Sequence, residues 1–390
     1  MKRLRSLCAI ACVCAIVSIG RDAHAQGTAR SMDFEQSIRT AGMGGAGVAV
    51  PWGVTSAWGN PATLGFAQGW GWDETRTQLV PGLASDVFLR TKRMTAGFGG
   101  VGVSWSGQPG GVGGLDLDYG WSDRTNESGA VLGTFRSYEQ VRSWGFGVSA
   151  ATLADRLGKR TGERSLARYG DVAFGENFKD ALVVLAPADL GGSARAKNHD
   201  WGVLARVSPS ALLRHGRDGV WDADVAFGHS VLNAGDELFD FGSTFGASPP
   251  SRIRRTGFAA NASLAQPTAM HMAFEHFPIL SALGPLVRLT VSFDHEAIVT
   301  GRGYEVDRSG QELSLLGVVD LRHGHVKDVV GEIVDDTRGI GFCLPLGKIA
   351  AFRWDYAEVP QARNSGLPNV TRRSWSMWVN PAEIIRKGGK

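Results

Sequence analysis

The chain has 390 residues, with 41 Lys and Arg against 38 Asp and Glu and a formal net charge of +3 at pH 7. Glycine is unusually frequent at 53 residues, tryptophan is plentiful at 12, and only 20% of the residues are charged. A chain so close to neutrality lacks the basic footprint of a protein that binds nucleic acid. No apolar run after residue 25 approaches the ~20 residues that a membrane-spanning helix needs.

Residues 1–25 have the layout of a cleavable export signal. A basic start precedes an apolar core, and Ala23-His24-Ala25 fits the small-x-small cleavage pattern. Cleavage removes four basic residues and one acidic residue, which leaves the mature chain formally neutral, and it leaves Cys343 as the one remaining cysteine. A single thiol forms neither an internal disulfide nor a cysteine metal cluster. We predict an exported protein without a cofactor or a metal site.

Residues 26–66 form the next unit. Its glycine-rich run, which includes Gly44 and Gly45, removes side-chain bulk and permits positive φ. Asn60-Pro61-Ala62 then predicts a rigid turn, because proline fixes φ. The same glycines fit G-x-G-x-x-G, but neither flank suits a βα unit, so nucleotide binding is not predicted. So little apolar area does not support an independent domain, and we expect this unit to pack inside something larger rather than serve as a plain linker.

Residues 67–379 contain many segments in which apolar and polar side chains alternate, as expected of strands. In 286–298 the apolar face carries Val287, Leu289, Val291 and Phe293, and the polar face carries Arg288, Thr290, Ser292 and Asp294. In 348–357 Phe352, Trp354 and Tyr356 oppose Arg353 and Asp355, and Leu115, Leu117, Tyr119 and Trp121 share a third such face. Several apolar faces end in an aromatic residue, as at Trp105, Trp121, Trp201, Trp354 and Trp378.

The length of these segments, about 9–12 residues, matches tilted strands that cross a membrane. We therefore predict an all-β fold, a transmembrane antiparallel β-barrel of roughly 14 strands with an N-terminal hatch inside its lumen. The apolar faces should meet outer-membrane lipid, and Arg288, Asp294, Arg353 and Asp355 should face the lumen. Stretches 153–197 and 230–252 are predicted as long external loops, and 380–390 as a tail. Alternation alone also fits a secreted or periplasmic β-sandwich binding protein, which stays an alternative.

Two parts of the chain resemble the FadL-type outer-membrane barrels and their PorV-like relatives. They are the glycine-rich run that leads to Asn60-Pro61-Ala62, and the aromatic-Asp-Tyr-Ala ending at 352–357. The resemblance implies a hatch at 26–66, built around Gly44, Gly45, Asn60, Pro61 and Ala62, within a barrel at 67–379. It also implies a location in the outer membrane of Gram-negative type.

Two functions follow from the resemblance. FadL-type barrels pass hydrophobic small molecules, whereas PorV-like relatives act as partners in protein secretion or surface attachment. The hatch motif is shared by both, and we favour passive transport of hydrophobic small molecules. An enzyme is not predicted, because no nucleophile elbow, P-loop or zinc-helix motif occurs. His323-Gly324-His325 and Asp294-His295-Glu296 are local clusters for which the spacing places no third metal ligand.

Overall fold

The computed structural model describes residues 28–51, 55–107, 114–213, 220–242, 246–266, 283–300, 303–347 and 349–381. The predicted leader at 1–25 and most of the predicted tail at 380–390 lie outside the described residues. No helix in the described ranges combines the length and the apolar character needed to cross a membrane.

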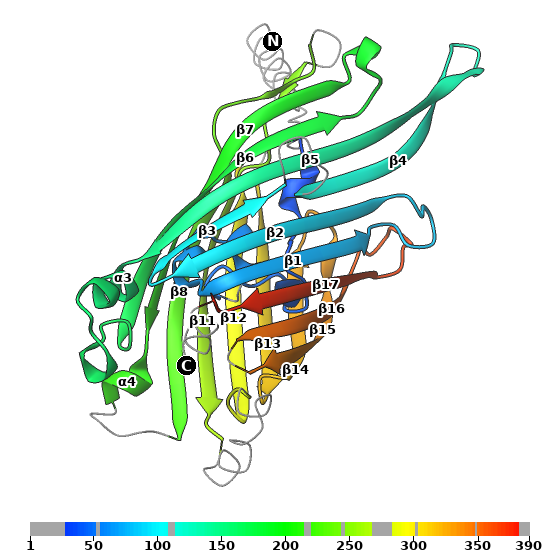
Figure 1. Cartoon of the computed structure of the whole chain (residues 1–390). Helices are drawn as coiled ribbons and strands as arrows, with labels where there is room; N and C mark the ends of the chain where they lie inside the picture. Colours follow the sequence, from blue (N-terminus) through cyan, green and yellow to red (C-terminus); the bar gives the residue numbers. More distant parts are fainter. Residues whose placement is uncertain are drawn as a thin grey trace, which may run out of the picture.

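Fifteen strands make one antiparallel sheet that closes on itself (Figure 1). They are β1 (Gly69–Gln78), β2 (Phe88–Phe98), β3 (Val101–Ser106), β4 (Leu115–Thr125), β5 (Val131–Ser149), β6 (Gly170–Val184), β7 (Ser193–Val207), β8 (Trp221–Ala234), β11 (Ile253–Leu264), β12 (Val287–Ile298), β13 (Tyr304–Leu315), β14 (Val319–Asp328), β15 (Ile333–Leu346), β16 (Ala350–Val359) and β17 (Val370–Val379). Two short strands, β9 (Phe239–Asp240) and β10 (Ala247–Ser248), form a separate ribbon.

The sheet is a closed barrel because β1 pairs with β17 on one side and with β2 on the other. Strands β3 and β4 each pair with both β2 and β5, so together they occupy one position in the wall. The fifteen strands therefore fill 14 positions around the barrel. The predicted fold class, an antiparallel β-barrel of roughly 14 strands, is confirmed. Closure leaves the described wall without an unpaired edge strand, which is a requirement for any sheet in a bilayer.

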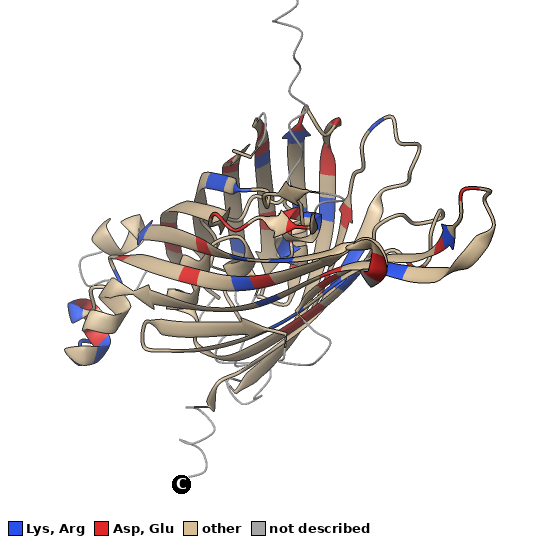
Figure 2. Cartoon of the chain, turned by 90° about the horizontal axis from the view of Figure 1, so that it is seen from above, with Lys and Arg blue, Asp and Glu red and all other residues tan. Residues whose placement is uncertain are grey.

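The helices are short and lie at the ends of the wall or inside it. Between strands lie α3 (Ala150–Leu157), η4 (Gly162–Arg164), η5 (Ala188–Leu190) and α4 (Pro209–Leu213). Ahead of β1 lie η1 (Arg30–Asp33), α2 (Ile38–Ala41), η2 (Ser56–Trp58) and η3 (Pro61–Phe66). The described residues before β1, 28–51 and 55–68, are called the inner segment below. The strands surround it, and charged residues of the chain lie within the ring (Figures 1 and 2).

The wall has apolar side chains outside and polar side chains inside over much of its height. On β12, Leu289 and Phe293 are 43% and 44% exposed, whereas Thr290 and Ser292 on the opposite face are 1% and 0% exposed. At these positions the polar face of β12 is turned inward and its apolar face outward. A water-soluble sandwich would bury the apolar face instead, so the wall has the polarity of a membrane barrel.

The opposite polarity occurs where β4 to β7 extend beyond the neighbouring strands (Figure 1). Here Ala181 and Val183 of β6 are buried in an apolar cluster, while Asp180 pairs outside with Arg195 of β7 at 3.5 Å. The prediction of a loop over 153–197 is wrong, because β6 and part of β7 lie within it.

The predicted common face of Leu115, Leu117, Tyr119 and Trp121 is wrong at Trp121. Leu115 and Leu117 are buried, and Tyr119 stays on their side, where its hydroxyl donates to the buried Glu139 at 2.7 Å, whereas Trp121 is exposed. The pairing of β4 with β5 shifts register between Asp118 and Trp121, and such a bulge moves the following side chains to the other face of the sheet.

Leu289→Arg tests the outward orientation of β12. A charged side chain facing lipid costs about 2–4 kcal/mol near the bilayer midplane and less toward the interfaces. We expect the substitution to destabilise the barrel in vesicles, so that its free energy of unfolding, measured by urea titration, falls by about 2 kcal/mol. Leu83→Arg is the matched control, because Leu83 is 74% exposed in a turn before β2. Equal effects of the two substitutions would contradict the orientation.

Candidate functional site: the filled lumen

The inner segment lies with its backbone against wall glycines. A Cβ added to any of these glycines would collide with the inner segment, most often with its backbone. They are Gly97, Gly102, Gly147, Gly175, Gly202, Gly228, Gly310 and Gly324, called the glycine row below. Any other residue at these positions would push the two backbones apart.

The contacts follow the chain around the wall. Met43 and Gly44 meet the glycines of β13 and β14, and Val48 meets the glycine of β8. Asn60 and Pro61 meet those of β7 and β6, and the end of η3 reaches β5, β3 and β2. The inner segment therefore lines most of the circumference before it enters β1.

Asn60 connects three elements at once. It caps η3 by accepting a hydrogen bond from the Ala62 amide at 3.0 Å. Its Nδ2 donates to the carbonyl oxygens of Val48 at 2.8 Å and of Val203 in β7 at 3.1 Å. A fully buried amide with each polar atom bonded stabilises the turn and its contact with the wall together.

The glycine-rich turn is held by side chains of three strands, β12, β13 and β15. Gly44 and Gly45 have φ of 69° and 82°, which explains glycine at both positions. The Gly44 amide donates to Thr337 Oγ1 at 2.8 Å, and Arg308 donates to the Gly44 carbonyl oxygen at 3.2 Å. Asp294 accepts from the next amides in the chain, those of residues 47 and 48, at 2.7 and 2.9 Å.

Two of the predicted lumen residues belong to one ion-pair network. Arg353 lies 2.8 Å from Asp355 and 2.5 Å from Asp320. Arg322 bridges Asp355 at 2.8 Å and Glu312 at 2.7 Å. Arg39 of α2 binds the same Glu312, with 2.7 Å between Nε and Oε2. The network thus attaches the inner segment to β13, β14 and β16.

A second network holds the start of the inner segment. Glu35 pairs with Arg255 of β11 at 3.1 Å, and Arg255 pairs with Glu296 of β12 at 2.7 Å. Arg308 of β13 adds a contact of 3.2 Å to the same Glu296. Removing one partner of such a buried network costs about 3–5 kcal/mol, because a charge is left unpaired.

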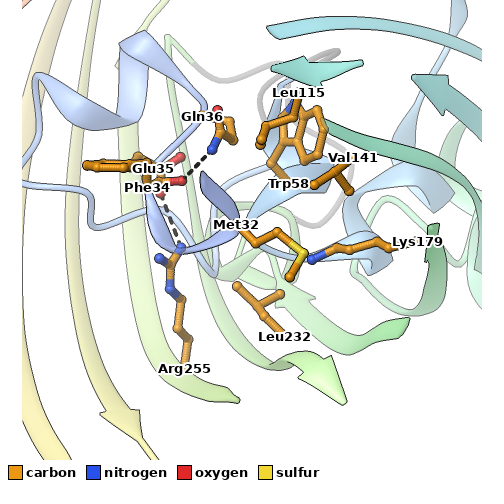
Figure 3. A pocket seen from close by; sticks show the side chains of 10 residues that line it. All are labelled: Met32, Phe34, Glu35, Gln36, Trp58, Leu115, Val141, Lys179, Leu232 and Arg255. Carbon is orange, nitrogen blue, oxygen red and sulfur yellow. Dashed lines mark hydrogen bonds and ion pairs between the residues drawn. The ribbon is translucent and has the colours of Figure 1, made fainter. Parts of the chain in front are cut away.

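The upper end of the lumen is almost completely packed. Trp58 lies beside Leu115 and Val141, and Met32 lies between them and Leu232, while Glu35 reaches Arg255 (Figure 3). The space among these side chains is about 10 Å³, enough for about one water molecule. The Arg93 guanidinium of β2 stacks on the Trp58 ring, 3.8 Å from its centroid.

A larger cavity of about 180 Å³ lies on another side of the inner segment. The lining comes from α2, the stretch before η2 and strands β1, β15, β16 and β17, and consists of Ile38, Arg39, Thr55, Asp73, Cys343, Ala351, Arg353, Asp355, Ser374, Ser376, Met377 and Trp378. Trp378, predicted from sequence among the aromatic residues that end apolar outer faces, instead lines this inner cavity.

The structure places the predicted residues as follows. Gly44, Gly45, Asn60, Pro61 and Ala62 are all buried in the inner segment. Asp294 binds its glycine-rich turn, and Arg353 and Asp355 line the 180 Å³ cavity. Arg288 is separate from these residues: it is half-buried in a hollow that Trp221 and Pro285 also line.

The histidine clusters lie in strands. His323 and His325 are in the middle of β14 rather than in a turn, and His325 lies 2.8 Å from Asp336 on the exposed side. His295 likewise lies outside, 2.9 Å from Asp307. The described residues contain no group of three side chains arranged to hold a metal ion.

Sequence reasoning missed most of the ion pairs. Glu312 and Arg322 carried a usable signal, because each has leucine as its neighbour within a strand, which places the charge on the inner face. No such signal in the sequence marks Glu35, Arg39 or Arg255, since their ion-pair partners are distant in sequence.

A scan against models of protein families and a search among curated proteins each find no match. Several solved structures are similar. A FadL homologue of Pseudomonas aeruginosa is 10% identical, with 87% of this chain and 97% of that chain covered and a TM-score of 0.39. The toluene transporter TodX of Pseudomonas putida is 11% identical, with 87% and 96% covered and a TM-score of 0.38. OprB of Pseudomonas putida is 10% identical, with 83% and 97% covered and a TM-score of 0.33.

At these identities the likeness is one of fold. The FadL type is represented among the similar structures, as the sequence resemblance predicted. The PorV-like role stays a prediction.

Asn60→Ala should loosen the inner segment more than Thr63→Ala does. The first substitution removes a helix cap and two hydrogen bonds to carbonyl oxygens, together about 2–3 kcal/mol. Thr63 makes one side-chain bond, to the Asn60 carbonyl oxygen at 2.8 Å, and its loss costs about 1 kcal/mol. Hydrogen exchange of the amides of 55–66 measures the difference. Equal loss of protection would show that Asn60 has no special role.

Gly202→Ala should displace the inner segment from β7. The added methyl group would collide with the Asn60 side chain, and such overpacking costs about 1–3 kcal/mol. Gly133→Ala in β5 is the matched control, because a Cβ there meets nothing within 4 Å. Limited proteolysis of the folded barrel should cut the inner segment faster in the first variant alone. Identical digestion patterns would contradict the close contact.

The start of the inner segment should be held more firmly at low pH. Burial raises the pKa of Asp33 from 3.8 to about 7, against the pull of Arg30, 3.1 Å away. A folded pKa above the unfolded value means that the protonated form favours docking. The contribution is complete below pH 3.8 and is lost as the pH rises through about 7.

Hydrogen exchange of the amides of 28–36, corrected for its intrinsic pH dependence, should therefore show more protection at pH 5 than at pH 8. Asp33→Asn, which cannot ionise, should abolish the difference. A difference that survives in this variant would assign the pH dependence to another group.

Proposed function

We propose that the protein is an outer-membrane channel for hydrophobic small molecules, in which the inner segment acts as a hatch. The carrying observation is that the lumen is filled by a segment held through side-chain hydrogen bonds and ion pairs, inside a wall closed by backbone pairing. Water or a permeating molecule can replace the side-chain bonds of the inner segment one at a time. The wall, in contrast, opens only if all the backbone hydrogen bonds between two neighbouring strands break. The hatch can therefore shift within an intact barrel.

The location and the substrate class rest on further observations. The export signal and the apolar outer face support the outer membrane. The resemblance to FadL-type barrels supports hydrophobic substrates. Ile38, Ala351 and Trp378 give the cavity beside the hatch an apolar part that suits them.

The alternative role in protein secretion has less support. It was based on long external loops at 153–197 and 230–252, yet β6 and the start of β7 lie within the first stretch. We therefore propose transport alone.

Transport can be tested in Gram-negative cells whose intact lipopolysaccharide slows hydrophobic compounds. Production of the protein should raise the rate at which 1-N-phenylnaphthylamine reaches the inner membrane and fluoresces. Swelling of liposomes in arabinose should stay slow, because the hatch blocks hydrophilic solutes. Uptake equal to that of cells without the protein would refute the proposal.

Deletion of 27–60 supplies the complementary variant. The barrel should still assemble and remain heat-modifiable, and arabinose should now enter liposomes quickly. Unchanged arabinose permeability would show that 27–60 does not close the lumen.

A further inference from the structure

The 180 Å³ cavity lies in the sector of the wall that the glycine row leaves out. Strands β1, β17, β16 and β15 contribute Asp73, Ser376, Arg353 and Cys343, and backbone pairing sets these residues directly opposite one another. They form one continuous row on the inner face. The cavity is thus built from neighbouring strands and from α2, with charged and apolar side chains in fixed positions.

Asp73 is the unmatched group of this lining. The residue is 1% exposed, and its Oδ1 has no hydrogen-bond partner among the described residues. Within the described part of the chain it also belongs to no ion pair shorter than 4.0 Å. A buried carboxylate oxygen without a donor is costly, and a ligand that supplies a donor removes that cost.

The nearest candidate partner is held elsewhere. Arg93 of β2 is directly opposite Asp73 in the pairing of β1 with β2. Its guanidinium instead stacks on Trp58 at 3.8 Å and donates to Ser143 at 3.4 Å. The inner segment, through Trp58, therefore keeps this cation away from the carboxylate.

The other charges around the cavity cancel. Three guanidinium groups, those of Arg39, Arg322 and Arg353, pair with three carboxylates, those of Glu312, Asp320 and Asp355. The network is neutral as a whole, and Asp73 is the one acidic side chain of the lining that stands outside it. The chemistry that fits is a cation with hydrogen-bond donors.

We propose that this cavity binds a small primary ammonium compound with a short apolar chain, whose ammonium group pairs with Asp73. The hydroxyl oxygens of Ser374 and Ser376 are further acceptors in the lining, and Ile38 and Trp378 offer apolar contacts to the chain. A volume of about 180 Å³ leaves room for a short alkylammonium ion. The inference concerns binding alone and does not depend on transport.

Cys343 is a built-in probe, since its thiol lines the same cavity. The purified full chain in detergent micelles is treated with N-ethylmaleimide, and modification of the peptide that contains Cys343 is followed by mass spectrometry. Butylammonium should slow the reaction, whereas 1-butanol and butyrate, of similar size, should not. Equal protection by 1-butanol would show an apolar pocket only and would overturn the proposal.

Substitution of the carboxylate sharpens the test. Asp73→Asn should raise the concentration of butylammonium for half-protection about tenfold or more. Glu74→Gln is the matched control: it is the next residue on β1, faces outward and pairs with Lys92 at 3.4 Å, so it should leave protection unchanged. Asp73→Glu keeps the charge and should keep the preference for the ammonium ion.

Unchanged protection in Asp73→Asn would overturn the proposal. If Asp73→Asn loses heat-modifiability, the variant has not folded into a barrel and its result is set aside. The proposal is then tested by Asp73→Glu and by the comparison of the three ligands on the native chain. Failure of 1-N-phenylnaphthylamine uptake would refute the transport function without affecting this result, because protection is measured without a membrane.

Discussion

The structure depends on one close contact, in which the backbone of the inner segment lies directly against the backbone of the wall. Gly97, Gly102, Gly147, Gly175 and Gly202 are directly opposite one another from β2 to β7, so they form a path without side chains. The inner segment runs along this path. A shift of any strand by one residue would turn its glycine outward and set a side chain against the inner segment. Strand register and the position of the inner segment therefore depend on each other.

Close approach by itself gives little hydrophobic stabilisation, because glycine offers little apolar area. Directional bonds supply the rest: Asn60 connects η3 to β7, Asp294 binds two consecutive amides, and Arg39 and Glu35 reach ion pairs of the wall. Buried ion pairs contribute modest net stability but strongly penalise arrangements that leave a charge unpaired. The inner segment is thus specified in position more than it is stabilised.

The polarity of the wall changes along its axis. Near Leu289 and Phe293 the outside is apolar and the inside polar, whereas near Ala181 and Val183 the inside is apolar and the outside charged. Below this change the outer face has the character of a lipid contact, and above it the strands behave like those of a water-soluble sheet. The apolar cluster at the upper end packs Met32 and Trp58 of the inner segment against Leu115 and Val141.

The sequence by itself determined the class of fold, the approximate number of strands and the orientation of β12, because alternation with period two follows directly from strand geometry. It also indicated a close-packed turn at Gly44, Gly45 and Asn60. Sequence reasoning failed at β6, because the pattern that indicates a lipid-facing strand is reversed in its second half, where Ala181 and Val183 face inward and Asp180 faces outward.

Only the tertiary structure decided which charges meet. Arg39 and Glu312 are 273 positions apart, and nothing local to either residue names the other. Asp73 looks like any inward polar residue in its strand, and its lack of a partner arises because Trp58 holds Arg93 away from it. The missing partner of Asp73 thus depends on β1, β2 and the inner segment together, and it arises only after the barrel has closed around the inner segment.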